Sequence, residues 1–411
     1  MTQMKLFKYL KISALVAGLA VVPAQVVQAA VVTPNTNMGS AVVIQANTGQ
    51  VLADQNGRER LPVASVSKLI VVYMLEQKIQ NHELALDQKV KVPTDIAAFS
   101  QDASVANVPM TTNRTYTVSQ ILDATLIESS NAAAMELAHL VAGSQEDYYR
   151  QAETLLSSWG IKNPKMYSAS GLRNGDLGTF EDNSVAPSAE NKFSAREIAL
   201  IAKHLVDDYP QILTYTQKKE ADFPLPDGTN MTLKNTNLLL GNQKYQIDGL
   251  KTGLTPNNGS NLVTHGKLNQ QPVITVVLNT NDHPRQEIFN QTLSVLDQVQ
   301  NQTKTQTPQT DHTIKIDNAA GNHGQVALDT KDGQQYFTKR TDGEITVKAI
   351  MPKKNVAAPL QVHKVIASGK VAFDQKTDAD FIDGKTPSVK LYPTKNVEKA
   401  DIFTTLIQKV S

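Results

Sequence analysis

A serine and a lysine placed directly before a long apolar run, in residues 62–76, constrain the fold more than any other feature. Lys68 follows Ser65 by three positions, and residues 69–75 are apolar nearly all round, which predicts a buried helix rather than a surface one. Positions three apart share one face of a helix, so the Ser65 hydroxyl and the Lys68 amine are within reach of each other. A lysine at the mouth of a buried helix loses hydration, and its lowered pKa makes it a base for a serine. The pattern also fits a serine that only caps the helix.

Length and composition exclude several classes of protein. At 411 residues the chain is long enough for two domains with a large core. A formal net charge of +1, with 19% charged and 5% aromatic residues, argues against a nucleic-acid-binding surface. The chain has no cysteine, which excludes disulfides, thiolate metal sites and cysteine nucleophiles. The histidines lack the paired spacing of metal ligands, so we expect neither a metal nor another cofactor.

The N-terminus has the pattern of an export signal. Lysines near the start precede an apolar stretch at 12–22, and Val27 and Ala29 occupy the −3 and −1 positions of a cleavage site. We predict a signal peptide over residues 1–29, cleaved after Ala29 or Ala30. The apolar stretch is short for spanning a bilayer, which argues against an uncleaved anchor. We therefore expect an exported protein that is stabilised by core packing alone.

The hydrophobic pattern predicts an α+β fold for the first three quarters of the chain. Two β-rich runs flank a turn at Gly49 and predict a hairpin over residues 41–54. Ser194 and Glu197 have the spacing of a capping box and predict the start of a helix. Other helices are expected at 117–141 and 285–299, and strands at 247–254, 260–268 and 272–279. Strands on both sides of the helices, without regular βαβ alternation, indicate a mainly antiparallel sheet with a helical cluster against it.

The last quarter of the chain has a different character. Residues 301–311 are polar and predict a linker, and short alternating runs over residues 312–395 predict a small all-β domain. Residues 396–411 predict a short amphipathic helix, whose apolar face comprises Ile402, Phe403, Leu406, Ile407 and Val410. Two interpretations of this helix stay open. It lies on a membrane surface as a peripheral anchor, or it docks on the β-rich domain.

Two further polar motifs accompany the serine and lysine. Ser129 and Asn131 belong to the polar break between two apolar helical runs. Lys251, Thr252 and Gly253 lie on a predicted strand, where an ammonium, a hydroxyl and a strand edge suit an extended peptide that ends in a carboxylate. Each triplet alone is common, since the first fits a helix cap and the second a turn. Their value lies in their joint occurrence and order.

In that order, Ser-x-x-Lys, Ser-x-Asn and Lys-Thr-Gly resemble the penicillin-binding protein and serine β-lactamase superfamily. The flanking sequence is similar to that of the low-molecular-weight D-alanyl-D-alanine carboxypeptidases of peptidase family S11. The similar stretches are the hairpin before the serine, 62–68, 127–133, 194–200 and 248–255. The resemblance covers roughly residues 36–300 and implies a penicillin-binding-type catalytic domain. The β-rich tail is similar to that family's second domain.

The resemblance implies a serine carboxypeptidase of cell-wall maturation, active on the outer face of the cytoplasmic membrane. Its substrate would be a peptidoglycan stem peptide ending in D-Ala-D-Ala, and β-lactam antibiotics would be covalent inhibitors. Ser65 would be the acylated nucleophile and Lys68 its general base. Ser129 would relay the proton to the leaving amine, and Asn131 would hold the substrate amide. Water, rather than a second peptide, would release the acyl group.

The third motif would bind the substrate's terminal carboxylate through Lys251 and Thr252, with Gly253 beside them. The resemblance places the oxyanion hole at the backbone N–H groups of Ser65 and Leu254. Some relatives carry a histidine at the position of Leu254, and some carry an arginine after the strand that ends near residue 278. Here Arg285 comes slightly later and is expected to be at most a helper in carboxylate binding.

Two alternatives remain. A class A-type β-lactamase needs an additional glutamate base between the second and third motifs, where Glu181 and Glu190 lie, but the expected Glu-x-x-x-Asn spacing is missing. A catalytically decayed cell-wall binding protein would have lost motif residues, whereas Ser65, Lys68 and Lys251 are all present.

Overall fold

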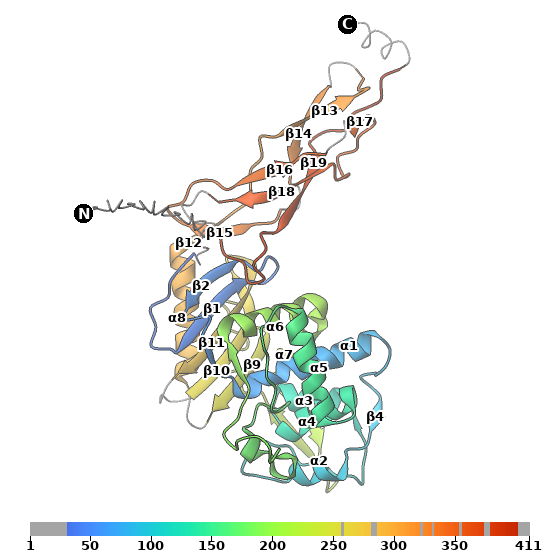
Figure 1. Ribbon diagram of the computed structural model, residues 1–411, viewed down its shortest axis with the longest axis vertical. Coiled ribbons are helices and arrows are strands. Elements are labelled where there is room, and N and C mark those ends of the chain that lie inside the picture. Colours follow the sequence, from blue (N-terminus) through green and yellow to red (C-terminus); the bar gives the residue numbers. More distant parts are fainter. Residues whose placement is uncertain are drawn as a thin grey trace, which may run out of the picture.

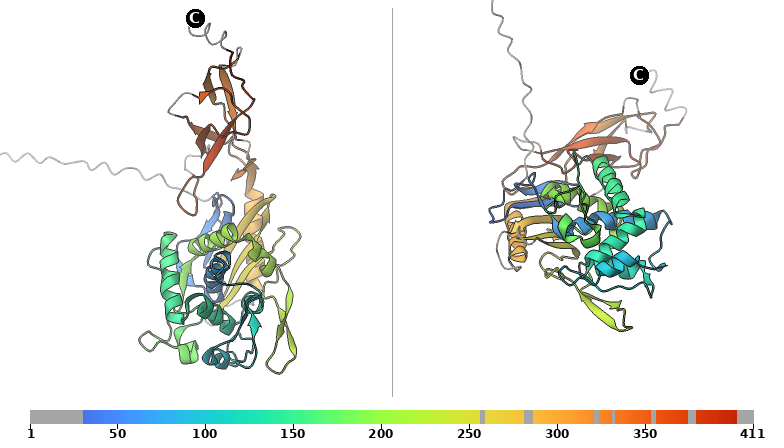
Figure 2. Two further views of the ribbon diagram at one scale, coloured as in Figure 1. Left: turned by 90° about the vertical axis from the view of Figure 1, so that its right-hand side faces the viewer. Right: turned by 60° about the horizontal axis from the view of Figure 1, so that its bottom comes forward.

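The computed structural model describes residues 31–255, 259–280, 286–320, 324–330, 333–352, 356–373 and 379–401. The predicted signal peptide, Arg285 and residues 402–411 lie outside these residues. Two regions stack along the long axis of the molecule, as Figure 1 and the left view of Figure 2 show. We call residues 31–302 the mixed region and residues 303–401 the β-rich region.

The mixed region is built on one antiparallel sheet with the strand order β2-β1-β11-β10-β9. The strands are β1 (Ser40–Gln45), β2 (Val51–Gln55), β9 (Gly249–Thr255), β10 (Gly259–Leu268) and β11 (Gln271–Thr280). The predicted hairpin is therefore present as β1–β2, with Gly49 at a φ of 72° in its turn. The three later predicted strands are also present, and β9 forms one edge of the sheet.

Both faces of this sheet are covered. Along β1, Val42 and Ile44 belong to the core beneath the helical cluster, whereas Ala41 and Val43 belong to the core beneath α8 (Glu287–Gln302). Helix α6 (Ala195–Asp208) packs on β1 and β11 from the first side, and α8 packs on β10 and β11 from the other (Figure 1). The mainly antiparallel α+β fold expected from the sequence is confirmed.

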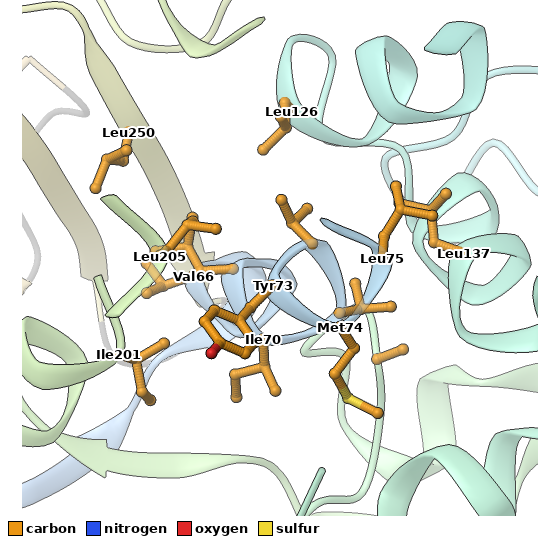
Figure 3. Close-up of a cluster of buried hydrophobic side chains, with 14 of the residues drawn as sticks. Val66, Ile70, Tyr73, Met74, Leu75, Leu126, Leu137, Ile201, Leu205 and Leu250 are labelled. Atoms are coloured by element: carbon orange, nitrogen blue, oxygen red, sulfur yellow. The ribbon is translucent and has the colours of Figure 1, made fainter. Parts of the chain in front are cut away.

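The apolar run after Ser65 forms the central helix of the cluster, α1 (Lys68–Gln80). Its residues 68–76 are all buried, as the sequence predicted. Figure 3 shows side chains of α1 packed among those of the surrounding elements. The other helices of the mixed region are α2 (Thr94–Phe99), α3 (Val118–Leu126), α4 (Asn131–Ala142), α5 (Gln145–Ser158) and α7 (Leu213–Thr216).

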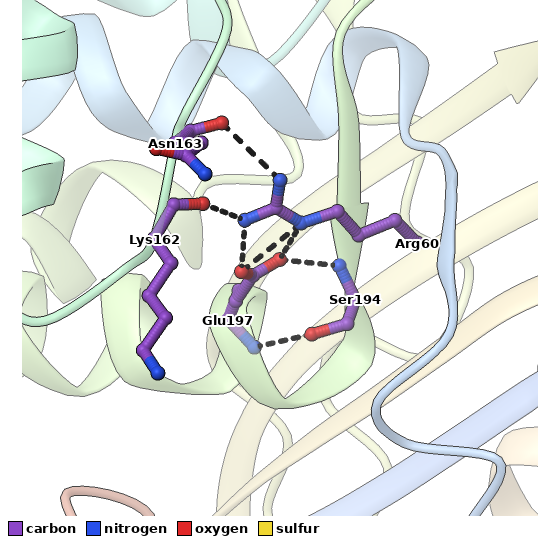
Figure 4. A network of polar contacts seen from close by, with 5 residues as sticks. All are labelled: Arg60, Lys162, Asn163, Ser194 and Glu197. Carbon is purple, nitrogen blue, oxygen red and sulfur yellow. Dashed lines mark hydrogen bonds and ion pairs between the residues drawn. The ribbon is translucent and has the colours of Figure 1, made fainter.

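Three short strand pairs lie outside the main sheet. They are β3 (Arg60–Pro62) with β6 (Lys192–Ser194), β4 (Lys89–Val90) with β5 (Tyr116–Thr117), and β7 (Glu220–Pro224) with β8 (Asn230–Lys234). The predicted capping box at the start of α6 is present, because Ser194 Oγ accepts from the Glu197 N–H and the Glu197 carboxylate accepts from the Ser194 N–H. That carboxylate also pairs with Arg60 on β3, at 2.5 Å (Figure 4). The start of α6 is thereby fixed to the strand that leads into Ser65.

The β-rich region contains a six-stranded sheet with the order β16-β18-β19-β14-β13-β17 and a two-stranded pair, β12–β15. Its strands are β12 (Thr303–Gln306), β13 (Thr313–Asp317), β14 (Gln325–Asp329), β15 (Tyr336–Lys339), β16 (Thr346–Ile350), β17 (Val356–Ala357), β18 (Ala367–Ala372) and β19 (Ser388–Pro393). The segment 301–311, expected to be a linker, is in part regular structure. Residues 301–302 end α8, and β12 pairs with β15. The buried Thr303 donates a hydrogen bond from its Oγ1 to Val299 O of α8.

The helix expected from residue 396 does not begin there. Val397 pairs with Leu360, and Lys399 with Ala319, so residues 396–401 run extended along the β-rich region. Val397 is buried in that region's core, which an extended segment achieves and a surface helix would not. The apolar positions that gave the helical pattern lie in residues 402–411, outside the described residues. No helix within the described ranges is long and apolar enough to cross a bilayer.

Specific polar contacts join the two regions. The Gln50 side chain donates to Phe337 O at 2.7 Å and accepts from its N–H at 2.9 Å. Arg196, near the start of α6, pairs with Asp54 on β2 and with the buried Asp380 of the β-rich region. The β-rich region is therefore tied to the same helix start that braces β3.

Candidate active site

Ser65 lies in one turn of 3-10 helix, η1 (Ala64–Ser67), which runs directly into α1. We call residues 63–68 the nucleophile segment. Ala64 has a φ of 47°, in the left-handed region that residues with a side chain rarely adopt. Ser65 lines a cleft of about 730 Å³ between the helical cluster and the edge strand β9. Its hydroxyl is thus exposed to a ligand while the helix behind it is buried.

The Lys68 amine has three partners around it. Its Nζ lies 2.7 Å from Ser65 Oγ, and it donates to Asn131 Oδ1 at 2.7 Å and to the Ser170 carbonyl at 3.0 Å. A neutral amine has two N–H groups and one lone pair, so donating to the two acceptors aims the lone pair at Ser65. Burial lowers the pKa of Lys68 well below its usual value, and the nearby Lys251 lowers it further. The amine is therefore suited to accept the serine's proton.

The residues of the second motif have two different roles: two line the cleft and one caps a helix. Ser129 and Asn131 line the cleft, and Ser129 has a φ of 65°. Ser130 points away from the cleft and caps α4, where its Oγ accepts from the Ala133 and Val108 N–H groups. The helix-cap interpretation thus applies to the middle residue, while the two outer residues line the same cleft as Ser65.

The third motif lies on the edge strand β9, as expected. Lys251 is buried, 1% exposed, and its Nζ donates to Thr252 O at 3.1 Å. Thr252 and Leu254 line the cleft, and the Leu254 side chain is 62% exposed. The Thr252 hydroxyl lies 2.6 Å from that of Thr236, which also lines the cleft. One hydroxyl donates to the other, which leaves the second hydrogen free to point at a ligand.

Two glycines hold the nucleophile segment between two main chains. A Cβ at Gly253 would lie 2.6 Å from the Val63 carbonyl oxygen and 3.3 Å from the Ser65 nitrogen. A Cβ at Gly171 would lie 1.9 Å from the Ala64 carbonyl oxygen, and Gly171 has a φ of 84°. These backbones meet Ser65 from both sides only because neither residue has a side chain. Gly253 was expected beside the ligand, and its structural role is this close approach.

Several site residues were not found from the sequence. The Ser170 carbonyl, Gly171 and Thr236 belong to no motif that the sequence analysis identified. A main-chain acceptor leaves no signature in side-chain identity, and Thr236 reaches Thr252 only through the folded chain. We call residues 167–171, which include the acceptor for Lys68, the lysine-holding loop.

The rim of the cleft carries charge. Glu190 lines it, and so do Arg173 and Asp176, which pair at 2.8 Å. Burial raises the pKa of Glu190, while Lys192 and Arg173 lower it and Asp176 raises it again. Arg173 and Asp176 line the cleft together with Glu190, whereas Lys192 is not among the cleft residues. Glu181 is not among the cleft residues, and Arg285 lies outside the described residues.

The arrangement is that of an acyl-transfer site. A nucleophilic hydroxyl, a desolvated amine in contact with it and a second hydroxyl across the cleft are the groups that a covalent acyl-enzyme requires. The described residues include no group of three or more histidine or acidic side chains that would hold a metal ion.

Comparison with known proteins agrees with this geometry. Residues 27–282 match the family described as D-alanyl-D-alanine carboxypeptidase, Peptidase_S11. Among curated proteins, the chain is 28% identical over 248 residues to the D-alanyl-D-alanine carboxypeptidase DacC of Escherichia coli. That match covers 60% of this chain and 57% of the relative, so the chain spans little more than half the relative's length.

Two solved structures extend the likeness. The peptidoglycan synthesis regulatory factor PBP3 of Streptococcus pneumoniae matches with a TM-score of 0.77 and 27% identity, over 89% of this chain and 100% of that one. Penicillin-binding protein D2 of Listeria monocytogenes, in the cefotaxime bound form, matches with a TM-score of 0.53 and 25% identity, over 65% of this chain and 99% of that one. The first likeness includes most of the β-rich region, since it covers so much of the chain.

Proposed function

Because the chain belongs to the D-alanyl-D-alanine carboxypeptidase family, peptidase family S11, we propose that it is a serine-type D-Ala-D-Ala carboxypeptidase. It removes the terminal D-alanine from peptidoglycan stem peptides and so acts in cell-wall maturation. The observation that carries the proposal is the Lys68 amine, buried and 2.7 Å from Ser65 Oγ in an open cleft. A hydroxyl that only capped a helix would not need a desolvated base.

In the acylation step, Ser65 Oγ attacks the carbonyl carbon of the penultimate D-alanine as its proton passes to the lone pair of Lys68. The backbone N–H groups of Ser65 and Leu254 stabilise the oxyanion. Ser129 relays a proton to the leaving nitrogen, the C–N bond breaks, and D-alanine departs. A water molecule then attacks the ester carbon and gives its proton to Lys68. The bond between that carbon and Ser65 Oγ breaks, Ser65 Oγ takes the proton from Lys68, and the shortened peptide is released.

The substrate is held at its C-terminus. Lys251 supplies a positive charge close to the cleft, and the paired hydroxyls of Thr252 and Thr236 supply a hydrogen-bond donor for the terminal carboxylate. Asn131 binds the substrate amide while its Oδ1 holds Lys68. The edge of β9 is available for main-chain pairing with an extended peptide. Carboxylate binding thus falls mainly on Lys251 and Thr252, with Arg285 at most a helper.

The deciding experiment is to label the mature protein and its Ser65→Ala variant with a fluorescent penicillin and measure the mass of the intact adduct. We expect a stable one-to-one adduct that the variant does not form, and release of D-alanine from a peptide ending in D-Ala-D-Ala. A folded protein without an adduct would favour the decayed cell-wall binding protein. An adduct lost within seconds would favour the β-lactamase.

We further propose that the protein is exported and acts outside the cytoplasm, with the β-rich region as a spacer between the catalytic cleft and the membrane. The signal pattern of residues 1–29 supports export. N-terminal sequencing of the secreted protein should give a start at Ala30 or Val31, and an intact Met1 would contradict it. Flotation with liposomes tests peripheral anchoring by residues 402–411, and a wholly unbound protein would exclude it.

A further inference from the structure

Asn191 is buried directly behind the nucleophile segment, 1% exposed. Its Nδ2 donates to Ser67 Oγ at 3.0 Å and to the Ser168 carbonyl at 2.7 Å, and its Oδ1 accepts from the Tyr167 N–H at 2.7 Å. Its own carbonyl accepts from the Val63 N–H at 3.2 Å. Asn191 therefore hydrogen-bonds to the nucleophile segment on one side and to the lysine-holding loop on the other.

The lysine-holding loop is the source of one of the two acceptors on Lys68. The Ser170 carbonyl accepts from Lys68 Nζ, and Ser168 Oγ accepts from the Ser170 and Gly171 N–H groups at 3.0 and 3.2 Å. These bonds fix the loop's internal turn. They do not by themselves fix the distance between the loop and the nucleophile segment, which is where the Asn191 side chain acts.

We propose that Asn191 is a positioning residue for the reaction of Ser65, setting the position of the Ser170 carbonyl against Lys68 by bridging Ser67 and the lysine-holding loop. The inference rests on the proposed function, because its effect is measured on acylation of Ser65. Asn191 touches neither the substrate nor the reacting atoms. It carries no part of the Ser-x-x-Lys, Ser-x-Asn and Lys-Thr-Gly motifs.

The physical argument follows from the three partners of the Lys68 amine. Removing the Asn191 side chain takes a buried hydrogen-bond partner from the Ser67 hydroxyl, the Ser168 carbonyl and the Tyr167 N–H. The lysine-holding loop then shifts, or water enters, so that these groups regain a hydrogen bond. The Ser170 carbonyl then no longer fixes one N–H of Lys68, and the lone pair is no longer held on Ser65. Water beside the amine also weakens the desolvation that makes Lys68 a base.

The test compares Asn191→Ala with the wild-type full chain, measuring acylation by a fluorescent penicillin across a pH series. We expect the acylation rate constant to fall by about 100-fold, the scale of a small misplacement of catalytic groups. The acidic limb of the pH profile should move to higher pH, because the rehydrated amine regains its proton more readily. The dissociation constant for the noncovalent penicillin complex should stay within about 3-fold of the wild-type value, since Asn191 does not touch the ligand.

Asn174→Ala is the matched control. Asn174 is also buried, and its amide makes a comparable set of bonds to the main chain at Asp182 and Val185, away from the nucleophile segment. Thermal unfolding should show similar destabilisation of both variants, whereas only Asn191→Ala should alter the pH profile. Ser67→Ala removes a single bond to Asn191, and in a double-mutant cycle its effect on acylation should be less than additive with that of Asn191→Ala.

The outcomes separate the two proposals. If wild-type Ser65 is not acylated, the proposed function fails. If the wild type is acylated but Asn191→Ala keeps its rate and pH profile, or if Asn174→Ala changes the profile equally, the positioning role of Asn191 is overturned. An additive double-mutant cycle would show that Asn191 does not act through Ser67. It would overturn the proposal that Asn191 bridges Ser67 and the lysine-holding loop.

Discussion

The mixed region and the β-rich region differ in where they place ionisable side chains. The mixed region buries Lys68 and Lys251 beside the cleft, and Glu136 on α4 is 0% exposed. The β-rich region places Lys348 and Lys370 directly opposite each other on the exposed face of its sheet. A lysine becomes a base only where water is excluded, and a single sheet with one solvated face does not exclude it. Burial, rather than residue type alone, distinguishes the lysines beside the cleft from those on the exposed face of the β-rich sheet.

Sequence pattern reflects the same difference. Helix α1 buries nine consecutive residues, 68–76, so a charge placed among them is desolvated. Strand β19 alternates exposed and buried positions, so its Lys390 stays in water while Val389 and Leu391 pack inward. The predictions below test this contrast in order of decreasing expected effect.

Replacing the buried base should have the largest effect. In Lys68→Arg a permanently charged guanidinium replaces the neutral amine and its lone pair, because a guanidinium is not deprotonated in proteins. Acylation by a fluorescent penicillin should slow by about 10³-fold, and the melting temperature should fall, because the guanidinium adds a buried charge. Acylation at the wild-type rate would mean that burial of Lys68 has no catalytic purpose, and the contrast between the regions would fail.

Removing a core side chain from the β-rich region should affect stability and not chemistry. Leu391 is fully buried, and Leu391→Ala should destabilise that region by roughly 2–5 kcal/mol. Acylation of Ser65 should continue at the wild-type rate in protein that calorimetry shows to be folded, because the cleft is lined by residues of the mixed region. A loss of acylation that parallels the loss of stability would show that the two regions function as one unit.

The buried Glu136 should make stability depend on pH. Both carboxylate oxygens lack a hydrogen-bond partner among the described residues, and burial, with a smaller contribution from Asp95, raises the pKa to about 8. The folded state therefore holds a proton that the unfolded state releases near pH 4.5. The stability that this proton provides is complete below that pH and is lost as pH rises toward 8.

Glu136→Gln removes this dependence. Between pH 4.5 and 7, the free energy of unfolding of the wild type should fall by roughly 3 kcal/mol relative to the variant, as measured by urea titration at each pH. Parallel curves for the two proteins would show that Glu136 is hydrated or paired and would weaken the contrast drawn here.

The smallest effect is expected on the exposed sheet. Lys370→Ala removes one of two like charges that lie opposite each other and should change stability by less than about 0.5 kcal/mol, in the stabilising direction. Thermal unfolding at low and high salt measures it. A large loss of stability would mean that Lys370 has stabilising partners within the protein.

The sequence predicted the residues that belong to the three motifs and missed those that reach the site only through the folded chain. Ser65 and Lys68 share a helical face by spacing alone, so their contact followed from the pattern. The Ser170 carbonyl and Asn191 could not be predicted, because both reach the site from loops far along the chain. The helix expected from residue 396 was wrong in its described part, because Val397 is held by pairing with Leu360, a contact that no local periodicity contains.

The two glycines beside Ser65 restrict how this protein can evolve. At Gly171 and Gly253 even a single methyl group would meet main-chain atoms rather than a flexible side chain. We therefore expect no other residue to be tolerated at either position. Under selection by a covalent inhibitor, variation is confined to the walls of the cleft, at side chains such as the exposed Leu254. Resistance mutations would thus change the access of an inhibitor to the cleft and leave the backbone around Ser65 unchanged.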